Sequence, residues 1–178
     1  MNVATKPRRI SLRPVTEADL PLLCQRAAAM ELRGEFESSR MGSPRSIQKR
    51  FAEDGYSSDD SEKLLVCAEG GEVIGDVSHF VAHRYATARE LGWAIHDPAL
   101  RGQGYGSAAA KALVDYLFDN FAINRLCCGL VPGNLASRRV AEKAGLRFEG
   151  CLRGVVFVRG EYLDSEVFGL VRADWQRD

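Results

Sequence analysis

Three glycines within five residues are the sequence feature with the clearest chemical meaning. They lie in residues 101–107 (RGQGYGS), between a predicted strand and the first turn of a predicted helix. Backbone N–H groups exposed at a helix N-terminus, the positive end of the helix dipole, bind phosphate oxygens. Glycine favours such binding because it has no side chain to obstruct the ligand. The segment predicts a site for a phosphate-bearing ligand, although a glycine-rich turn before a helix has the same pattern.

Two known patterns of phosphate-binding loop can be compared with this segment, and only one of them is complete. The dinucleotide-binding pattern G-x-G-x-x-G fails at its last position, which is Ser107. That pattern also needs an acidic residue at the end of the next strand for a ribose hydroxyl, and residues 124–131 contain none. The pattern R-x-x-G-x-G is complete, with Arg101, Gly104 and Gly106. A nucleotide-binding oxidoreductase is therefore the weaker interpretation.

The strands and helices that must position this segment are predicted from hydrophobic spacing and turn residues. Seven strands are predicted, at residues 10–14, 64–69, 72–80, 88–96, 124–131, 147–158 and 161–171. Helices are predicted at residues 16–30, 44–51 and 134–145 and directly after residue 106. Residues 55–63, rich in Ser and Asp, are expected to form a surface loop. Hairpins on both sides of a central strand–helix–strand–helix unit indicate a mixed α+β sheet.

Longer stretches of the chain resemble a known family. Residues 90–96 (ELGWAIH) are similar to the fourth strand of ribosomal-protein N-acetyltransferases, and residues 131–150 (VPGNLASRRVAEKAGLRFEG) are similar to their N-x-x-S helix and the segment directly after it. With the R-x-x-G-x-G segment, these motifs make the chain resemble the ribosomal-protein branch of the GNAT superfamily of acyl-CoA N-acyltransferases. The resemblance implies the GNAT fold: a mixed, mostly antiparallel sheet of about seven strands, helices on both faces and a parallel, splayed central strand pair.

The same resemblance implies acetyl-CoA as co-substrate and assigns residues to it. The implied cofactor-binding residues are Ala94, Ile95, Arg101, Gly102, Gln103, Gly104, Tyr105, Gly106, Ser107 and Asn134. Backbone groups around Ala94 and Ile95 would polarise the thioester carbonyl, which can supply about 3 kcal/mol. Ser137 would protonate or hydrogen-bond the departing thiolate. By capping preference alone, Asn134 and Ser137 fit a plain helix start better than a site.

The general base is less well defined by the sequence. An incoming ammonium must lose a proton, because only the neutral amine has a free lone pair. Glu90 is the first candidate for this base. The pattern fits equally well a Glu90 that is only a solvent-facing strand residue. Some members of the branch have a carboxylate seven residues beyond the position of Glu149, where this chain has Val156. Glu35 and Glu37 are further candidates for binding a cationic amine.

Composition and charge limit the class of protein. With 178 residues, 46% of them hydrophobic, the chain is expected to form one domain spanning residues 1–178. Equal numbers of basic and acidic residues, 24 of each, exclude a whole-molecule basic field for nucleic acid or an anionic membrane. Five cysteines without a Cys-x-x-Cys pattern favour reduced thiols and a cytoplasmic location. His79 and His83 lack the further ligands that a metal site needs, so no metal is predicted.

Together these observations predict an enzyme, an N-acetyltransferase that moves an acetyl group from acetyl-CoA to a primary amine by direct attack in a ternary complex. The acceptor would be a protein N-terminal α-amine or a small-molecule amine. No nucleic acid or membrane partner is expected, and the resemblance leaves room for a homodimer. The alternative is a non-catalytic acetyl-CoA-binding sensor or interaction module, which the valine at position 156 keeps open.

Overall fold

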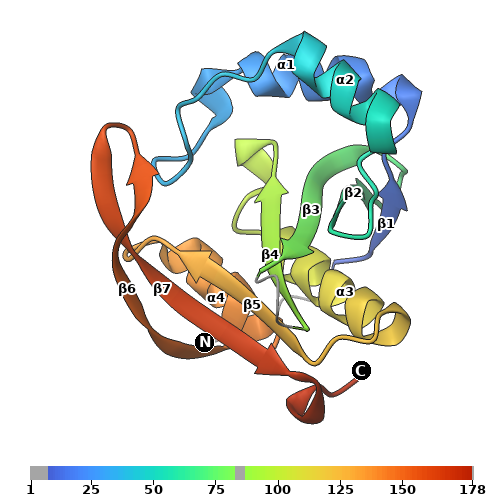
Figure 1. The fold of residues 1–178 in the computed structure, drawn as a ribbon. Helices are drawn as coiled ribbons and strands as arrows, with labels where there is room; N and C mark the ends of the chain where they lie inside the picture. The colour runs from blue at the N-terminus through green and yellow to red at the C-terminus, as the bar shows by residue number, and fades with distance from the viewer. Residues whose placement is uncertain (1–7, 83–86, 178) are drawn as a thin grey trace.

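A seven-stranded sheet organises the chain in the order β1-β2-β3-β4-β5-β7-β6 (Figure 1). The computed structural model describes residues 8–82 and 87–177. The strands are β1 (Ile10–Pro14), β2 (Ser61–Ala68), β3 (Val73–Val81), β4 (Ala88–Ile95), β5 (Arg125–Leu130), β6 (Arg147–Val158) and β7 (Glu161–Val171). The α-helices are α1 (Leu20–Ala28), α2 (Pro44–Asp54), α3 (Tyr105–Asn120) and α4 (Leu135–Lys143). The short 3₁₀ turns are η1 (Glu17–Asp19), η2 (Met30–Leu32), η3 (Pro98–Leu100) and η4 (Arg172–Asp174).

The central strand pair, β4 and β5, is parallel, whereas the other neighbouring strands that the structure describes pair antiparallel. The parallel pairing is confined to residues Ala88–Glu90 of β4 and Arg125–Cys127 of β5. Beyond Glu90, β4 pairs only with β3, and beyond Cys127, β5 pairs only with β7. The two strands therefore diverge toward their carboxyl ends, as Figure 1 shows. This confirms the predicted parallel, splayed pair in a mostly antiparallel sheet.

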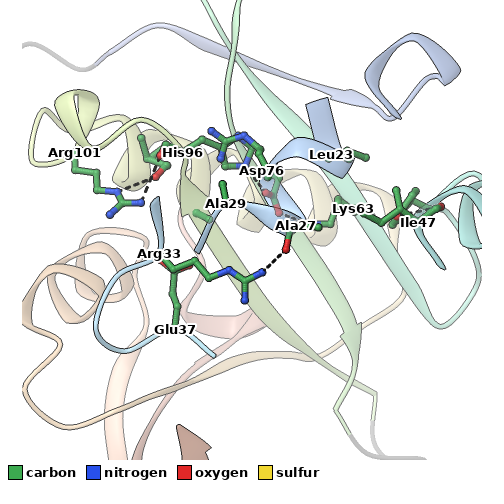
Figure 2. Close-up of a pocket in the computed structure, with 14 residues that line it drawn as sticks. Leu23, Ala27, Ala29, Arg33, Glu37, Ile47, Lys63, Asp76, His96 and Arg101 are labelled. Carbon is green, nitrogen blue, oxygen red and sulfur yellow. Dashed lines mark hydrogen bonds and ion pairs between the residues drawn. The ribbon is translucent and has the colours of Figure 1, made fainter. Parts of the chain in front are cut away.

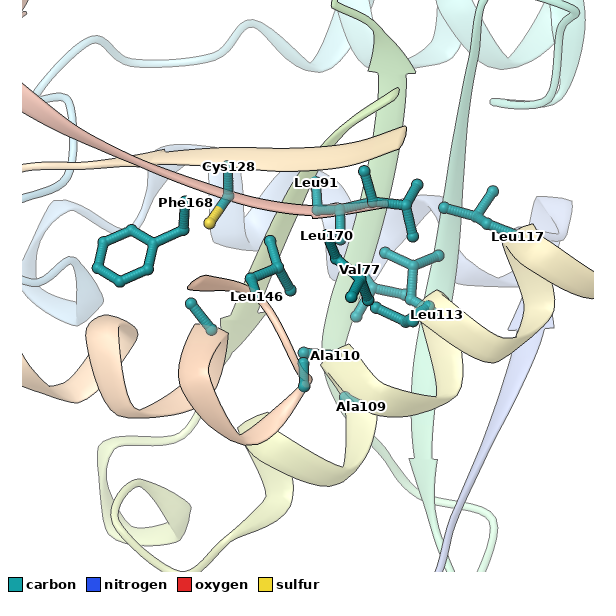
Figure 3. Close-up of a cluster of buried hydrophobic side chains, with 14 of the residues drawn as sticks. Val77, Leu91, Ala109, Ala110, Leu113, Leu117, Cys128, Leu146, Phe168 and Leu170 are labelled. Atoms are coloured by element: carbon teal, nitrogen blue, oxygen red, sulfur yellow. The ribbon is translucent and has the colours of Figure 1, made fainter. Parts of the chain in front are cut away.

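Helices cover both faces of the sheet. On one face, α3 and α4 pack on the main core, in which Leu113 and Leu117 of α3 are buried (Figure 3), together with Phe118. On the other face, α1 and α2 pack on a smaller cluster that includes Leu23 and Leu65. Successive strand residues point to opposite faces, so Leu64 and Val66 join the main core while Leu65 joins the smaller cluster. The sheet is thus buried on both sides at β2, whereas β6 at its edge is largely exposed, and the carboxyl ends of β4 and β5 diverge to leave room for a site.

Two local predictions about this α1–α2 side were wrong. The predicted surface loop 55–63 ends early, because β2 begins at Ser61. Its polar residues enter the strand because β3 pairs with them and because they find partners: Lys63 forms an ion pair with Asp76, and the Tyr116 hydroxyl donates to Glu62 at 2.9 Å. The first helix also ends at Ala28 rather than at residue 30, where η2 begins. Pairing with β3, not local sequence preference, sets the start of β2.

Candidate active site

A groove of about 500 Å³ opens where β4 and β5 diverge. Its walls are the end of β4, the loop before α3, one side of α4 with its N-cap Asn134, and residues 34–37. The residues predicted to bind the cofactor that line it are Ala94, Ile95, Arg101, Gly102, Gly104, Gly106, Ser107 and Asn134, and the predicted acid Ser137 joins them. Gln103 and Tyr105 do not line it. The Gln103 amide donates to the Ala99 carbonyl at 2.7 Å, and the Arg8 guanidinium lies over the Tyr105 ring.

The glycine loop has a backbone conformation that other residues rarely adopt. Gly102 has φ +73° and Gly104, the N-cap of α3, has φ +93°. A β-carbon at Gly106 would lie 3.4 Å from Val140 Cγ2 of α4, so this glycine allows the two helices to approach. The loop residues Gly102, Gly104 and Gly106 have no side chains of their own and line the groove at the N-terminus of α3, which fits a phosphate-bearing ligand.

Arg101 has a structural contact that the sequence did not predict. Its Nε donates to the carbonyl of Ile95 at 3.0 Å, and its Nη2 lies 3.5 Å from the carbonyl of His96 (Figure 2). The guanidinium thus fixes the glycine loop to the end of β4. Two other cations of the groove, Arg139 and Lys143 of α4, make no hydrogen bond or ion pair with the residues that the structure describes.

Asn134 caps the N-terminus of α4, and the Ser137 hydroxyl is left for the groove. The Asn134 Oδ1 accepts a hydrogen bond from the backbone N–H of Ser137 at 3.1 Å, so Asn134 caps α4 through its own side chain. The Ser137 hydroxyl forms no hydrogen bond with any described residue and faces the groove. Capping therefore does not require the hydroxyl, which is available to a ligand.

Glu90 lies at the closed end of the diverging strands, as the last β4 residue paired with β5. It is half-buried, and burial raises the pKa of its carboxyl above the ordinary value. It lines neither cavity of the site. Ala94 is four residues further along β4, which corresponds to about 13 Å. A proton therefore cannot pass directly from an amine in the groove to Glu90, and its transfer would need a relay.

A second cavity, of about 280 Å³, lies between α1, α2, residues on either side of η2 (Ala29, Arg33 and Glu37) and the adjacent face of β2–β4 (Figure 2). It shares Glu37, Ala94, Ile95 and Arg101 with the groove, so the two cavities adjoin at the end of β4. Glu35 also lines the groove. The structure thus brings the two candidate amine-binding carboxylates to the groove, with Glu37 at the junction. Glu37 Oε1 accepts from the backbone N–H of Gly34 at 3.1 Å, which orients it.

A buried polar network that sequence reasoning missed forms the floor of the second cavity. Asp76 forms an ion pair with Lys63, and its Oδ2 lies 2.6 Å from His96 Nε2. Burial alone would raise the pKa of Asp76, but the Lys63 charge and the His96 contact hold it well below its usual range. Because an ionised carboxylate only accepts, Nε2 carries the proton of His96. No spacing links these three residues, since each comes from a different strand or strand end.

The two histidines considered as metal ligands do not form a metal site with described residues. His79 is buried with Nε2 3.3 Å from Glu62 Oε2, and His83 lies outside the described residues. Within residues 8–82 and 87–177, no group of three or more His, Cys, Asp or Glu side chains is arranged to hold a metal ion. In the same ranges, no helix is long and apolar enough to cross a membrane.

Comparisons with known proteins agree with this geometry. The family model of the acetyltransferase (GNAT) domain matches residues 9–147. The probable N-acetyltransferase YjcK of Bacillus subtilis is 35% identical over 110 residues, which cover 62% of this chain and 61% of that protein. The ribosomal-protein-serine acetyltransferase of Escherichia coli is 26% identical over 109 residues, which cover 61% of this chain and 60% of that protein. The structure of spermidine N-acetyltransferase from Vibrio cholerae, in complex with CoA and spermine, superposes with a TM-score of 0.80 at 17% identity, covering 93% and 96% of the two chains.

The chain therefore belongs to the GNAT acetyltransferase family, and its relatives include ribosomal-protein acetyltransferases, as the sequence motifs indicated. It is an acyl-CoA-dependent N-acetyltransferase with acetyl-CoA as co-substrate. The non-catalytic alternative receives no support from these matches. The matched regions span about three fifths of the two curated relatives, whose names concern ribosomal proteins or leave the acceptor open.

Proposed function

We propose that the chain transfers the acetyl group of acetyl-CoA to a primary amine by direct attack, with both reactants bound at once in a single domain spanning residues 1–178. The observation that supports this most is the junction of the two cavities. The groove carries the glycine loop and Ser137, the second cavity carries the charged network, and the end of β4 belongs to both. Holding two reactants in register removes much of the entropic barrier to their reaction.

The residues of the groove fit acetyl-CoA, which when bound supplies a thioester whose acetyl group a neutral amine can attack. Backbone N–H groups of the loop containing Gly102 and Gly104 would hold the pyrophosphate at the N-terminus of α3. Arg139 and Lys143 would add positive charge for phosphate. Backbone groups at Ala94 and Ile95 would bind the pantetheine arm and stabilise negative charge on the carbonyl oxygen. The Asn134 side-chain nitrogen, which donates to none of the described residues, would donate to the same arm.

Ser137 is proposed as the group that assists thiolate departure. A free thiol has a pKa of about 8.5, so the leaving sulfur needs only a hydrogen bond or one proton. The Ser137 hydroxyl can donate this hydrogen bond because the cap of α4 does not use it. The attacking nitrogen loses one proton as the amide forms, and this proton replaces any proton that the hydroxyl gives to the sulfur.

Deprotonation of the incoming ammonium is proposed to involve carboxylates. Glu35 and Glu37 would attract the ammonium to the groove, where both lie. Glu90 would accept the proton through water, because it lies where β4 and β5 are still paired and not in the groove itself. Burial raises the pKa of Glu90, which makes its carboxylate a stronger base than an exposed one.

A covalent acetyl-enzyme on Cys127 is disfavoured by the state of this thiol. Cys127 pairs with Glu90 across the parallel strands, and its Sγ lies 3.6 Å from the carbonyl of Arg89, to which it donates. Burial raises the pKa of Cys127, so it stays a protonated and weakly nucleophilic thiol. Direct transfer is the simpler path for this site.

A cytoplasmic location and a homodimer are also part of the proposal. All five cysteines are free, which favours the reducing cytoplasm. A homodimer would cover the apolar side chains exposed on the β6–β7 hairpin, among them Leu152, Phe157 and Tyr162. The acceptor is a protein N-terminal α-amine or a small-molecule amine.

The experiment that tests the proposal incubates the full chain with acetyl-CoA and a panel of small amines and N-terminal peptides. The readout is release of free CoA thiol together with acetylated amine. Amine-dependent thiol release at one acetyl transferred per thiol supports the proposal. Thiol release that no amine in the panel accelerates contradicts it.

A further inference from the structure

One cation of the second cavity lacks a partner among the described residues. Arg26 of α1 is half-buried, its Nε is buried without a hydrogen-bond partner, and it forms no ion pair with any described residue. The cavity's other cations are engaged. Lys63 pairs with Asp76, Arg101 donates to the Ile95 carbonyl, and Arg33 donates to the Ala27 carbonyl at 2.8 Å. Arg26 is therefore the lining cation, within the described ranges, whose hydrogen-bonding capacity is unused.

The charge of the cavity lining is unbalanced. Four cationic side chains, Arg26, Arg33, Lys63 and Arg101, face two carboxylates, Glu37 and Asp76. Asp76 is already shared between Lys63 and His96, so its charge favours the Arg26 cation only through space, without a hydrogen bond or an ion pair between them. Burying a guanidinium without a partner is unfavourable, and burial accordingly lowers the pKa of Arg26. A bound anion would supply the missing charge.

We propose that Arg26 binds a carboxylate of the acceptor, so that the acceptor is a small amine that also carries a carboxylate, as a free amino acid does. This rests on the acetyl transfer proposed above. A planar guanidinium with free N–H groups binds a carboxylate through two parallel hydrogen bonds. Glu37, at the junction of the two cavities, holds the ammonium end of the same molecule beside the groove.

Size and charge separate this acceptor from the two classes named by the relatives. The cavity volume of about 280 Å³ corresponds to roughly nine water molecules at ~30 Å³ each, which suits a small molecule. A polyamine would bring further positive charge toward Arg26 and Lys63. A protein N-terminal residue has a neutral peptide bond where a free amino acid has its carboxylate, so it cannot neutralise Arg26.

The test compares matched pairs of acceptors. The full chain with acetyl-CoA is assayed against free α-amino acids and their α-carboxamides, which keep the amine and lose the anion, and against spermidine and an N-terminal peptide. We expect kcat/KM for the best amino acid to exceed that of its carboxamide by about 30-fold or more. Preference for the carboxamide, for spermidine or for the peptide would overturn the proposal.

The variant Arg26→Gln shows which residue is responsible. It should remove the preference for the acid, mainly through KM, and leave the carboxamide unchanged. Arg26→Lys keeps the charge without the planar guanidinium. Its preference for the acid over the carboxamide should lie between those of the wild type and Arg26→Gln. The matched control is Arg45→Gln, at an exposed arginine of α2 outside both cavities, which should behave as the wild type. An unchanged preference in Arg26→Gln, with CoA still raising its melting temperature, would contradict the assignment.

Calorimetry separates failure of this inference from failure of the proposed function. The same amino acids and carboxamides are titrated into the CoA-loaded protein. If no amine is acetylated but an amino acid binds more tightly than its carboxamide, and Arg26→Gln abolishes the difference, acetyl transfer fails as the function and the carboxylate site stands. If no amino acid binds more tightly than its carboxamide, the carboxylate site is wrong, whether or not other amines are acetylated.

Discussion

The groove and the second cavity adjoin but recognise their ligands in different ways. The groove is built largely from two contiguous segments, residues 100–107 and 134–143, and offers backbone N–H groups at helix starts. The second cavity takes its charged side chains one at a time from separate segments, with Arg26 from α1, Lys63 from β2 and Asp76 from β3. Recognition by backbone requires glycines in sequence, which leaves a motif. Recognition by charged side chains from separate elements leaves no motif, because these residues are scattered along the sequence.

The largest expected effect comes from removing the central charge of the second cavity. Asp76→Asn leaves the Lys63 ammonium unpaired, which should lower the free energy of unfolding by about 3 kcal/mol and the melting temperature by roughly 6–12 °C. CoA affinity should stay near that of the wild type, since Asp76 does not line the groove. The control Asp59→Asn removes an exposed carboxylate and should leave stability unchanged.

The pH dependence of this effect has a defined sign. The pKa of Asp76 is lower in the folded protein than in the unfolded chain. Its contribution to stability is therefore full above the unfolded pKa of about 3.9 and is lost as the pH falls toward the folded value. The difference in melting temperature between wild type and Asp76→Asn should shrink as the pH is lowered from 6 toward 3, a range of about three units. A constant difference, or loss of CoA binding, would argue against separate roles for the two cavities.

The second-largest expected effect is the loss of cofactor binding in the groove, with the second cavity left intact. Gly104→Val places a β-branched side chain at φ +93° in the loop, so CoA should no longer stabilise the protein. For wild type, CoA at 100 times its dissociation constant adds about 2.7 kcal/mol, which thermal melting detects. Gly71→Val in the β2–β3 turn is the matched control, because Gly71 has φ +85° and open space around it. Both variants carry backbone strain, but only Gly104→Val should lose the response to CoA. A normal CoA response in Gly104→Val would show that the loop does not bind the cofactor.

The third effect distinguishes chemistry from helix capping within the groove. Ser137→Ala should lower kcat by about a hundredfold and leave stability and CoA affinity nearly unchanged, because the cap uses the Ser137 backbone N–H. Asn134→Ala removes the capping oxygen and should lower the free energy of unfolding by about 1 kcal/mol. If Ser137→Ala turns over at the wild-type rate, the hydroxyl does not assist thiolate departure.

The smallest effect concerns Glu90, which lies outside both cavities. As the proposed base, it must be ionised, so the rising limb of the pH profile of kcat/KM should lie above the ordinary glutamate pKa, and Glu90→Gln should shift that limb. Because burial raises the pKa of Glu90, its ionisation opposes folding at neutral pH. Glu90→Gln should therefore melt slightly higher than wild type at neutral pH and equally at low pH. An unchanged rate profile would leave Glu90 with a structural role only.

The same contrast explains what the sequence could predict. The strands β6 and β7 were predicted with their observed bounds, because the turn at Arg159-Gly160, where both residues have positive φ, separates them locally. The glycine loop and Ser137 were found because they belong to contiguous motifs. Arg26 and Asp76 could not be found, because nothing in a helix or strand pattern tells which polar residue the fold will bury. The misplaced start of β2 has the same cause, since Ser61 and Glu62 become strand residues only through their pairing with β3.

The most direct test of simultaneous binding at the two cavities is a single-turnover experiment with acetyl-labelled CoA and the best acceptor of the amine panel. Excess protein is mixed with labelled acetyl-CoA, with and without the amine, and the label is followed on protein and on product after rapid quenching. The account predicts that the label appears on the amine at the rate of thiol release, and that protein without amine stays unlabelled. Labelled protein that forms before the acetylated amine would contradict direct transfer between two adjoining sites.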